Sequence, residues 1–380
     1  MDFGNMMQEG KMTSYMFSKA CARKLPLSGT FELSPVCNMS CKMCYIKKTI
    51  EEVRNSPRAI MKLKEWIALA EQLREQGMLY LLLTGGEPFL WPDFWQLYEK
   101  LTEMGFLISI NSNGTLIDNR AIDKLKQRPP TRINITIYGA HDATYEKLCG
   151  TKGAFSKVDH AVTGLIKAGI PVKLNCSLSP ANAGDLERIV RYAEEKNLIL
   201  DVATYMFPPV RRDNSCIGEN ERFTPHDGAY YDLKRYRLQY GEEKYQQYLN
   251  KIVNGSVFPP GVERNYIDPA DGRLRCRAGK ASFWITWDGW LTPCGFMSSP
   301  CVDVHQYGFE DAWKLLTEEC EGLVLSGICS RCANQGLCHA CAAMAIAETG
   351  SIERVPLYLC RWIQETREIA EKELADKKEF

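Results

Sequence analysis

The sequence predicts an α/β protein in which a parallel sheet covered by helices forms an incomplete barrel, followed by a small cysteine-rich domain with a β-hairpin and helices. Two observations support this prediction. Between residues 28 and 207, short apolar, β-rich runs alternate with amphipathic helical stretches, a pattern typical of a parallel sheet with covering helices. Beyond residue 272 the alternation ends, and seven cysteines follow in a regular order.

Six β-rich runs are the expected strands, and six such units fit an incomplete barrel. The strands are predicted at residues 31–35, 78–84, 106–111, 132–137, 171–177 and 198–205. Helical patterns lie between them at residues 60–77, 93–105, 155–169 and 185–197. Active sites of parallel α/β barrels form at the C-terminal ends of the strands, so the residues that follow each strand are the first candidates for function.

The chain divides into four expected parts. Residues 1–27 form an N-terminal extension, 28–207 the barrel, 208–272 a bridging segment and 273–380 the cysteine-rich domain. The bridging segment is polar and broken by Pro and Gly, with a Tyr/Lys/Glu-rich helical stretch inside it. The C-terminal stretch IQETREIAEKELADKKEF is predicted to be a charged helix with a solvated outer face.

Composition excludes several classes of function. Lys plus Arg and Asp plus Glu both number 47, a balance that does not favour a nucleic-acid partner. The N-terminus lacks a secretory pattern, and no run approaches the roughly 18 apolar residues of a membrane helix. We therefore expect a soluble, cytoplasmic protein. Its sixteen cysteines then favour metal or cluster binding over disulfides, and oxygen-sensitive clusters indicate an anaerobic or low-oxygen source.

Cys37, Cys41 and Cys44 follow the first predicted strand with the spacing Cys-x3-Cys-x2-Cys. Three soft thiolates suit an iron–sulfur cluster, and the missing fourth ligand leaves one iron open. A structural zinc site would be closed by four ligands. The spacing therefore predicts a cluster that binds a reactant, with a chance triplet or a partial zinc site as the alternative.

A second motif, Gly85-Gly86-Glu87-Pro88, follows the second predicted strand directly. Two glycines let the backbone approach a ligand closely. Taken alone, the motif is also compatible with an ordinary turn at the end of a strand.

Together these motifs, with Met43 and Tyr45 flanking the last cysteine, resemble the signature of the radical S-adenosylmethionine (radical SAM) superfamily. The resemblance implies a partial (β/α)6 barrel, similar to a TIM barrel, with a [4Fe–4S] cluster on the three cysteines. SAM would chelate the fourth iron, and the GGEP backbone would bind its amino group. Reductive cleavage would give a 5'-deoxyadenosyl radical that abstracts hydrogen from a substrate. An external donor such as flavodoxin or ferredoxin would supply the electron.

Further residues of the SAM pocket follow from the same resemblance. Ser112 and Asn113 end the third strand and are expected to line the ribose pocket, although Asn-Gly is also a common turn pair. Tyr138, at the end of the fourth strand, and Asn175, on the fifth, are similar candidates. Cys149 stands where many members have Arg, so an Arg clamp on the SAM carboxylate is in doubt.

No catalytic residue is assigned from the sequence. His141 and Asp142 precede a helical stretch, and Asp is a common N-cap. We therefore expect both residues to cap that helix.

The C-terminal cysteines resemble the SPASM domain, an extension found in peptide-modifying radical SAM enzymes. The order is Cys276-x12-Gly289-x4-Cys294, then Cys329-x2-Cys332-x5-Cys338-x2-Cys341, then Cys360. The family pattern has x3 where this chain has its last x2. The resemblance implies two auxiliary [4Fe–4S] clusters: a first one on Cys276, Cys294 and Cys341, and a second on Cys329, Cys332, Cys338 and Cys360. A pair of zinc knuckles is the alternative.

The first auxiliary set holds three cysteines, so its fourth ligand is open. Cys301 and Cys216 are candidates from the sequence, and a substrate thiolate or another outside ligand is a further possibility. Either cysteine can equally be an ordinary thiol.

The stretch SFWITWDGWLTPCGF predicts a β-hairpin around Asp288-Gly289, a strong two-residue turn signal. The hairpin would carry Cys294 back toward Cys276. Its tryptophans are expected to pack around a cluster, with stacking of one of them on the substrate as the alternative: Trp284, Trp287 and Trp290.

The leading hypothesis is a radical SAM oxidoreductase that modifies a peptide or protein side chain, forming a thioether or carbon–carbon crosslink in a ribosomal peptide. About 28 residues precede the barrel, so we expect leader recognition to use a separate protein or the barrel surface, unless the substrate has no leader. One alternative is a formylglycine-forming, sulfatase-maturing enzyme, although Gly295 follows Cys294 where that subfamily has Asp. Others are oxidation of a tetrapyrrole or another small molecule, and a non-catalytic scaffold.

Overall fold

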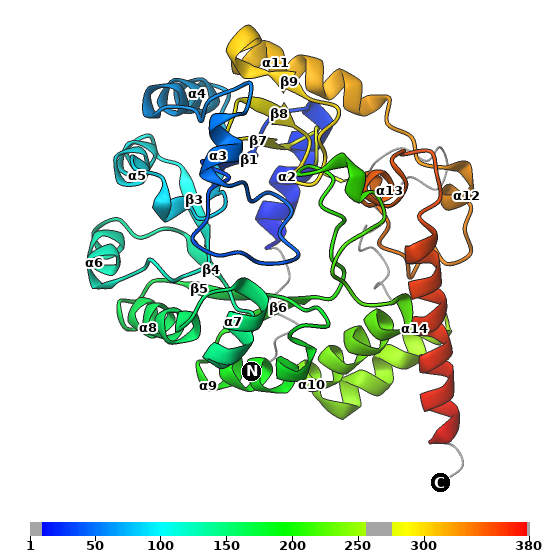
Figure 1. The fold of residues 1–380 in the computed structure, drawn as a ribbon. Helices are drawn as coiled ribbons and strands as arrows, with labels where there is room; N and C mark the ends of the chain where they lie inside the picture. The colour runs from blue at the N-terminus through cyan, green and yellow to red at the C-terminus, as the bar shows by residue number, and fades with distance from the viewer. Residues whose placement is uncertain (1–9, 256–275, 378–380) are drawn as a thin grey trace.

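The computed structural model describes residues 10–255 and 276–377. Its centre is one sheet of nine strands in the order β6-β5-β4-β3-β2-β1-β7-β8-β9 (Figure 1). All six predicted barrel strands are confirmed, and neighbouring strands among them pair in parallel. Their bounds are β1 (Ser28–Glu32), β2 (Tyr80–Thr84), β3 (Leu107–Ser112), β4 (Arg132–Thr136), β5 (Val172–Ser177) and β6 (Ile199–Ala203).

Helices cover the outer face of this sheet (Figure 1). The four predicted helices are present as α4 (Leu63–Glu75), α5 (Phe94–Glu103), α8 (Ala154–Lys167) and α9 (Leu186–Glu195). The helix expected after His141 is present as α7 (Asp142–Cys149). The structure adds α3 (Ile50–Arg54) and α6 (Asn119–Gln127), with the short 3-10 helices η1 (Pro88–Leu90) and η2 (Ala183–Asp185). The α6 helix begins where the Asp118 carboxylate accepts from the Ala121 amide, a strong N-cap that the sequence analysis missed.

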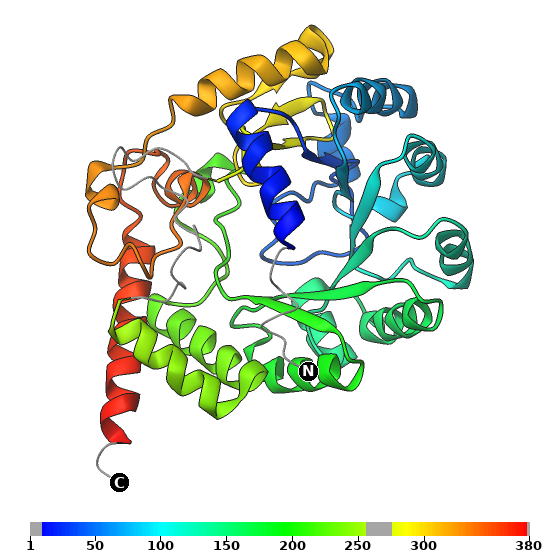
Figure 2. The ribbon, with the colours of Figure 1, turned by 180° about the vertical axis from the view of Figure 1, so that it is seen from behind.

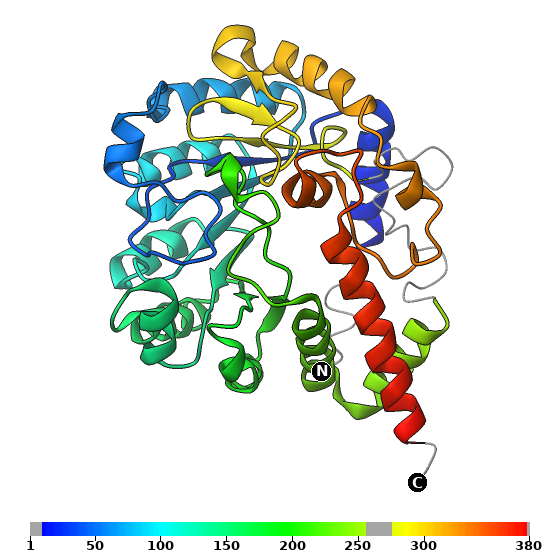
Figure 3. The same cartoon turned by 45° about the vertical axis from the view of Figure 1, so that its right-hand side comes forward.

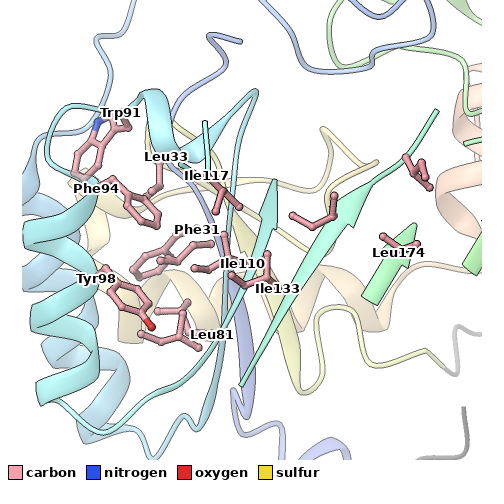
Figure 4. Packing of buried hydrophobic residues seen from close by; sticks show 14 of the residues in the cluster. Phe31, Leu33, Leu81, Trp91, Phe94, Tyr98, Ile110, Ile117, Ile133 and Leu174 are labelled. Carbon is pink, nitrogen blue, oxygen red and sulfur yellow. The ribbon is translucent and has the colours of Figure 1, made fainter. Parts of the chain in front are cut away.

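The hydrophobic core lies between the sheet and these helices. Figure 4 shows Phe31, Leu81, Ile110 and Ile133 on the outward faces of successive strands, with Tyr98 of α5 beside them. These side chains are almost fully buried, and each contributes about 1.5–3 kcal/mol by leaving water. Because successive side chains of a strand alternate in direction, the residues between them face the barrel interior, and many of those are polar.

The predicted hairpin is present, but it continues the barrel sheet. Strand β7 (Ser282–Ile285) pairs in parallel with β1, so that Phe31 lies opposite Ile285. Strands β8 (Trp290–Thr292) and β9 (Val302–Asp303) then pair antiparallel. Strand β7 thereby covers an edge of β1 that would otherwise expose unpaired backbone groups. The cysteine-rich region is thus joined to the barrel through backbone hydrogen bonds.

The N-terminal extension contains a helix that the sequence analysis did not predict, α2 (Lys11–Arg23). Phe17 stacks on Tyr80 with ring centroids 5.8 Å apart. Phe17 and Ala20 also pack against Leu27 and Ala281. Figure 2 shows α2, in blue, across the back of the barrel. Residues 1–9 of this part lie outside the described range.

The bridging segment includes η3 (Asn214–Cys216) and the predicted helix, α10 (Pro225–Val253), which is broken at Gly241 where φ is 79°. The segment's last part, residues 256–272, and the first residues of the cysteine-rich domain, 273–275, lie outside the described residues. Four helices complete the C-terminal region: α11 (Val304–Glu321), α12 (Gly327–Ser330), α13 (Ala342–Thr349) and α14 (Leu357–Asp376). Figure 3 shows α14, in red, alongside α10. One face of α14 is therefore buried against α10, and two of its carboxylates take part in this contact: Glu365 pairs with His226, and Glu373 accepts from Tyr245.

Within the described residues, no helix is both long enough and apolar enough to span a membrane.

Candidate active site

The cysteine triplet lies in a loop that follows β1 and folds back on itself. The amide of Lys48 donates to the Pro35 carbonyl over 3.1 Å, and the amide of Ser40 donates to the Cys149 carbonyl at the end of α7 over 2.8 Å. These bonds hold both halves of the loop against the C-terminal ends of the strands. The position is the one where parallel barrels form their active sites.

The three thiols of this loop lie close together. Burial raises the pKa of Cys37 to about 11, and the neighbouring thiolates of Cys41 and Cys44 add to the rise. The amide of Met39 donates to the Cys37 sulfur over 3.4 Å, and the amide of Lys47 donates to the Cys44 sulfur over 3.3 Å. Backbone donors aimed at sulfur stabilise thiolates and tune clusters. The donor set therefore fits an iron–sulfur cluster.

Cys41 has two further polar neighbours. Hydrogen bonds from the Cys149 thiol and the Tyr138 hydroxyl lower the pKa of Cys41. Cys149 is fully buried, and its pKa is raised by the bond to Cys41 and by burial. Tyr138, expected in the SAM pocket, thus lies beside a thiol of the triplet. In the sequence, Cys149 stands out only as a position where many family members have Arg.

The GGEP motif packs backbone to backbone against the segment that leads into the cysteine loop. A Cβ on Gly85 would lie 2.5 Å from the Ser34 carbonyl oxygen, and a Cβ on Gly86 would lie 2.4 Å from that of Val36. The Gly86 amide donates to Ser34 over 2.7 Å, and the Glu87 amide donates to Val36 over 3.1 Å. These amides are therefore occupied.

Glu87 turns away from this backbone into the protein. Its fully buried carboxylate accepts from the Asn113 amide over 2.8 Å and from the Ser112 hydroxyl over 2.9 Å. Burial raises the pKa of Glu87 to about 7, and these donors oppose the rise. The contacts make Glu87 a positioning residue that ties the end of β3 to the motif, whereas Pro88 begins η1.

Asn113 continues the connection to the triplet. Its side-chain amide donates to Asn38 Oδ1 over 2.9 Å and lies 3.7 Å from the Cys37 sulfur. Glu87, Asn113 and Cys37 thus form a continuous chain of contacts.

Asn175 lies on β5, and its side-chain oxygen is buried with no hydrogen-bond partner among the described residues. The same is true of Asn134 Oδ1 on the adjacent strand β4. Buried polar atoms are nearly always paired, so two orphaned acceptors on neighbouring strands fit a ligand that carries hydroxyl donors, such as a ribose.

The first auxiliary set also gathers in one place. Cys276, Cys294 and Cys341 pack against one apolar cluster that includes Met297 and Leu325. Burial raises the pKa of Cys341 to about 12, with Cys294 and Cys276 adding to the rise.

The second auxiliary set gathers separately. Burial raises the pKa of Cys338 to about 11, and the thiolates of Cys360, Cys329 and Cys332 raise it further. The Ala340 amide donates to the Cys338 sulfur over 3.4 Å. In residues 10–255 and 276–377, no three Cys, His, Asp or Glu side chains converge on a point that would hold a single metal ion.

A buried ion pair joins the barrel, the bridging segment and the first auxiliary set. Glu32, at the end of β1, is fully buried and accepts from Arg211 over 3.0 and 3.2 Å. The Trp284 indole donates to the same carboxylate over 2.7 Å. Arg211 also donates to the carbonyl of Gly295, next to Cys294, over 2.7 Å. Arg211 lies in a Pro-containing loop with no periodic signal, so the sequence did not indicate it.

Among the three hairpin tryptophans, Trp284 lies beside a predicted ligand. A Cβ on Gly295 would lie 2.7 Å from its ring. Trp287 and Trp290 stack instead with Lys48 and Arg58, at 5.5 Å and 4.0 Å from the ring centroids.

An aromatic contact joins the two cysteine regions. Tyr45, which follows Cys44, lies with its ring 4.7 Å from that of Phe296, two residues after Cys294. Phe296 in turn stacks on Phe207 at 4.0 Å.

His141 caps the helix that follows it, as predicted, because its ring accepts from the Thr144 amide at the start of α7. Asp142 does not cap α7. It is the first residue of that helix, and its carboxylate accepts from the Phe155 amide of α8 over 2.7 Å.

Comparison with known proteins agrees with this geometry. Residues 31–193 match the model of the radical SAM superfamily. The AdoMet-dependent heme synthase of Methanosarcina barkeri is 23% identical over 346 residues, covering 87% of this chain and 95% of that protein. The sporulation killing factor maturation protein SkfB of Bacillus subtilis is 24% identical over 302 residues, covering 78% of this chain and 68% of that protein.

The fold has solved counterparts. The structure of Streptococcus suis SuiB bound to its precursor peptide SuiA aligns with a TM-score of 0.65 at 17% identity, covering 92% of this chain and 81% of SuiB. The cysteine triplet, the GGEP contacts and the match over residues 31–193 lead to one conclusion: this part of the chain is a radical SAM domain, and the chain is a radical SAM enzyme with relatives of the SPASM type.

Proposed function

We propose that this enzyme oxidatively modifies a side chain of a peptide or protein, most simply by forming a thioether or carbon–carbon crosslink in a ribosomal peptide. In this proposal residues 28–207 hold SAM and its [4Fe–4S] cluster, and residues 273–380 hold two auxiliary [4Fe–4S] clusters. The bound cluster and SAM would supply the one-electron chemistry that removes hydrogen from the substrate. Cys37, Cys41 and Cys44 would hold that cluster.

Residues of the barrel edge would hold SAM. The backbone carbonyls of Gly85 and Gly86 suit its ammonium group. The unpartnered oxygen of Asn175 suits a ribose hydroxyl. Tyr138 and Asn113 flank the triplet, and Ser112 and Glu87 hold Asn113 in position.

The observation that carries the proposal is the contact between the two cysteine regions. Tyr45 and Phe296, whose rings are 4.7 Å apart, follow Cys44 and Cys294 closely in the sequence. An auxiliary cluster at Cys294 would therefore lie next to the SAM site. A product radical there can pass its electron to the auxiliary cluster, which makes the net reaction an oxidation.

The charged side chains in the barrel interior are paired with one another, which favours a substrate group that carries no charge. Lys173 pairs with Asp201 over 3.1 Å, and Arg211 pairs with Glu32. Matched pairs suit a peptide side chain better than a polyanion. SkfB is by name the maturation protein of a sporulation killing factor, and SuiB was solved with a precursor peptide, which favours the same substrate class.

Tetrapyrrole oxidation is the second candidate, because the heme synthase relative aligns over 95% of its own length. Formylglycine formation is less well supported. The subfamily's Asp would stand at Gly295, where the Trp284 ring leaves no room for a side chain.

The test is anaerobic turnover of the reconstituted enzyme with dithionite and SAM. Peptides encoded beside its gene and a propionate-bearing tetrapyrrole are offered in parallel. We expect peptide-dependent 5'-deoxyadenosine and a peptide that has lost a pair of hydrogen atoms by mass spectrometry. Turnover of the tetrapyrrole alone would overturn the peptide proposal.

A flavodoxin or ferredoxin should replace dithionite, and a separate leader-binding protein should lower the KM for a leader-bearing peptide.

A further inference from the structure

The first auxiliary set holds only three of the seven patterned cysteines, yet another thiol lies next to it. Cys320 is on the last turn of α11, outside the SPASM pattern, and is buried, with 4% of its surface exposed. A Cβ on Gly279 would lie 2.3 Å from the Cys320 sulfur and 3.9 Å from Pro293 Cβ. Gly279 is three residues after Cys276, and Pro293 directly precedes Cys294. The Cys320 sulfur therefore lies near the segments that carry two predicted ligands.

Gly279 makes this approach possible. Its φ is +68°, a conformation that glycine adopts without strain. Its amide donates to the Ser282 carbonyl over 2.9 Å, which closes the turn that begins after Cys276. Without a side chain at this position, the sulfur of Cys320 reaches the backbone of the turn.

We propose that Cys320 is the fourth thiolate ligand of the auxiliary cluster held by Cys276, Cys294 and Cys341. The proposal rests on the auxiliary-cluster part of the proposed function and goes beyond it. Four cysteine thiolates would leave no iron open for a substrate thiolate. The cluster would then carry electrons rather than bind substrate.

Electrostatic coupling agrees with this placement. Burial raises the pKa of Cys320 to about 12, and the thiolates of Cys276 and Cys294 both add to the rise. Burial also raises the pKa of Cys21, on α2, but of the three ligands only Cys276 contributes there. The pKa of Cys301 is raised by burial and shifted by Glu319, Arg58 and Asp288, with no contribution from a ligand thiolate. Of these three thiols, Cys320 is therefore the one that interacts with two predicted ligands of the first auxiliary set.

The test uses the full chain with Cys37, Cys41 and Cys44 changed to Ala, which removes the SAM cluster. After reconstitution this background should contain about eight irons, four for each auxiliary cluster. Mild ferricyanide oxidation should leave it without a [3Fe–4S] signal in electron paramagnetic resonance, because no iron lacks a thiolate. Adding Cys320→Ala should produce a [3Fe–4S] signal of about one spin per chain, since a cluster with three thiolates loses its unprotected iron.

Matched variants in the same background make the result specific. Cys360→Ala, in the second auxiliary set, should produce a comparable signal, whereas Cys301→Ala and Cys21→Ala should produce none. If Cys320→Ala cannot be recovered with iron, Cys320→Ser decides: an altered spectrum of the reduced cluster supports ligation, and an unchanged spectrum overturns it. The inference is also overturned if the background already gives the [3Fe–4S] signal and Cys320→Ala adds nothing. A background with only about four irons would instead contradict the proposed auxiliary clusters.

Discussion

At the scale of single residues, the site depends on groups that hold its ligands in place. Glu87 illustrates this, because its carboxylate contacts the end of β3 while its backbone belongs to the GGEP motif. A carboxyl group that is fully buried pays a desolvation cost when it ionises. The three donors around it, from Phe89, Ser112 and Asn113, offset only part of that cost.

Glu87 therefore gives the stability a definite pH dependence. The pKa of Glu87 is about 7 in the folded chain, above its ordinary value of 4.5. Between those values the folded state binds more protons than the unfolded state, so this group's contribution to stability falls as pH rises. Glu87→Gln cannot ionise. We expect the thermal midpoint of the wild type minus that of the variant to decrease from about pH 6 to about pH 8. Both midpoints are measured anaerobically by thermal unfolding. An increase in this difference would contradict the assignment.

Asn113 gives a second prediction, for the SAM cluster. Its side-chain amide lies 3.7 Å from the Cys37 sulfur, and a donor near a cluster sulfur raises the reduction potential. Asn113→Asp keeps the shape but replaces the donor with a negative charge. We expect a more negative potential in a redox titration and a roughly tenfold loss of SAM cleavage, the equivalent of about 1.4 kcal/mol.

Asn111→Asp is the matched control for this variant. It adds the same charge two residues earlier, on β3, but the Asn111 side chain contacts Asn134 rather than a thiol. Equal shifts in both variants would show that charge alone, and not the contact with Cys37, sets the potential.

At the scale of elements, the sequence predicted what local patterns encode. The six barrel strands and four of their helices carry clear periodicity and were predicted to within a few residues. The α6 helix was missed because it is short and because Asp118 was not recognised as its N-cap, although Asp is a common residue at that position. Strand β7 was predicted as part of a hairpin, but its parallel pairing with β1 joins residues about 250 positions apart. No local pattern specifies such a partner.

The residues of the candidate site also fall into those that a local sequence pattern predicts and those that it does not. The patterned cysteines and GGEP were predicted because their fixed spacing in the sequence indicates their chemistry. Cys320, Arg211 and the inward role of Glu87 became visible only from the structure, since each depends on contacts between distant segments.

The packing of α10 on α14 gives a prediction at this scale. A Cβ on Gly228 of α10 would lie 2.3 Å from the Trp362 ring of α14. Gly228→Ala should overpack this contact and destabilise the fold by about 1–3 kcal/mol, measured as a lower thermal midpoint. Gly184→Ala is the control, because a Cβ there meets no atom within 4 Å. Equal midpoints in the two variants would show that α14 shifts freely on α10.

At the scale of the whole molecule, the barrel and the cysteine-rich region are held together by a shared sheet and by buried charge. Strand β7 extends the barrel sheet, and the Arg211–Glu32 pair crosses from the bridging segment to the end of β1. Arg211 and Trp284 also hold the Gly295 backbone. The geometry of Cys294 therefore depends on a charge pair whose acidic member belongs to the barrel.

Breaking this pair should disturb the first auxiliary site more than the SAM site. Removing one member of a buried ion pair leaves the other unpaired and costs about 3–5 kcal/mol. In Arg211→Met the Glu32 carboxylate stays buried and, among the described residues, keeps the Trp284 indole as its one side-chain partner, while the Gly295 carbonyl loses the bond from Arg211. We expect a lower thermal midpoint and loss of about four irons, while the cluster on Cys37, Cys41 and Cys44 keeps its SAM-dependent spectral change.

The double variant Glu32→Gln/Arg211→Met separates the effect of the unpaired Glu32 charge from the effect of the lost bond between Arg211 and Gly295. It removes the unpaired carboxylate, so the thermal midpoint should recover much of the loss, because replacing both members of a buried pair is often nearly neutral. The Gly295 carbonyl still lacks its donor, so iron loss at the first auxiliary site should persist. If the iron content recovers together with the midpoint, Arg211 acts only on stability. If neither recovers, the bond from Arg211 to Gly295, and not the charge pair, is what holds the cysteine-rich region on the barrel.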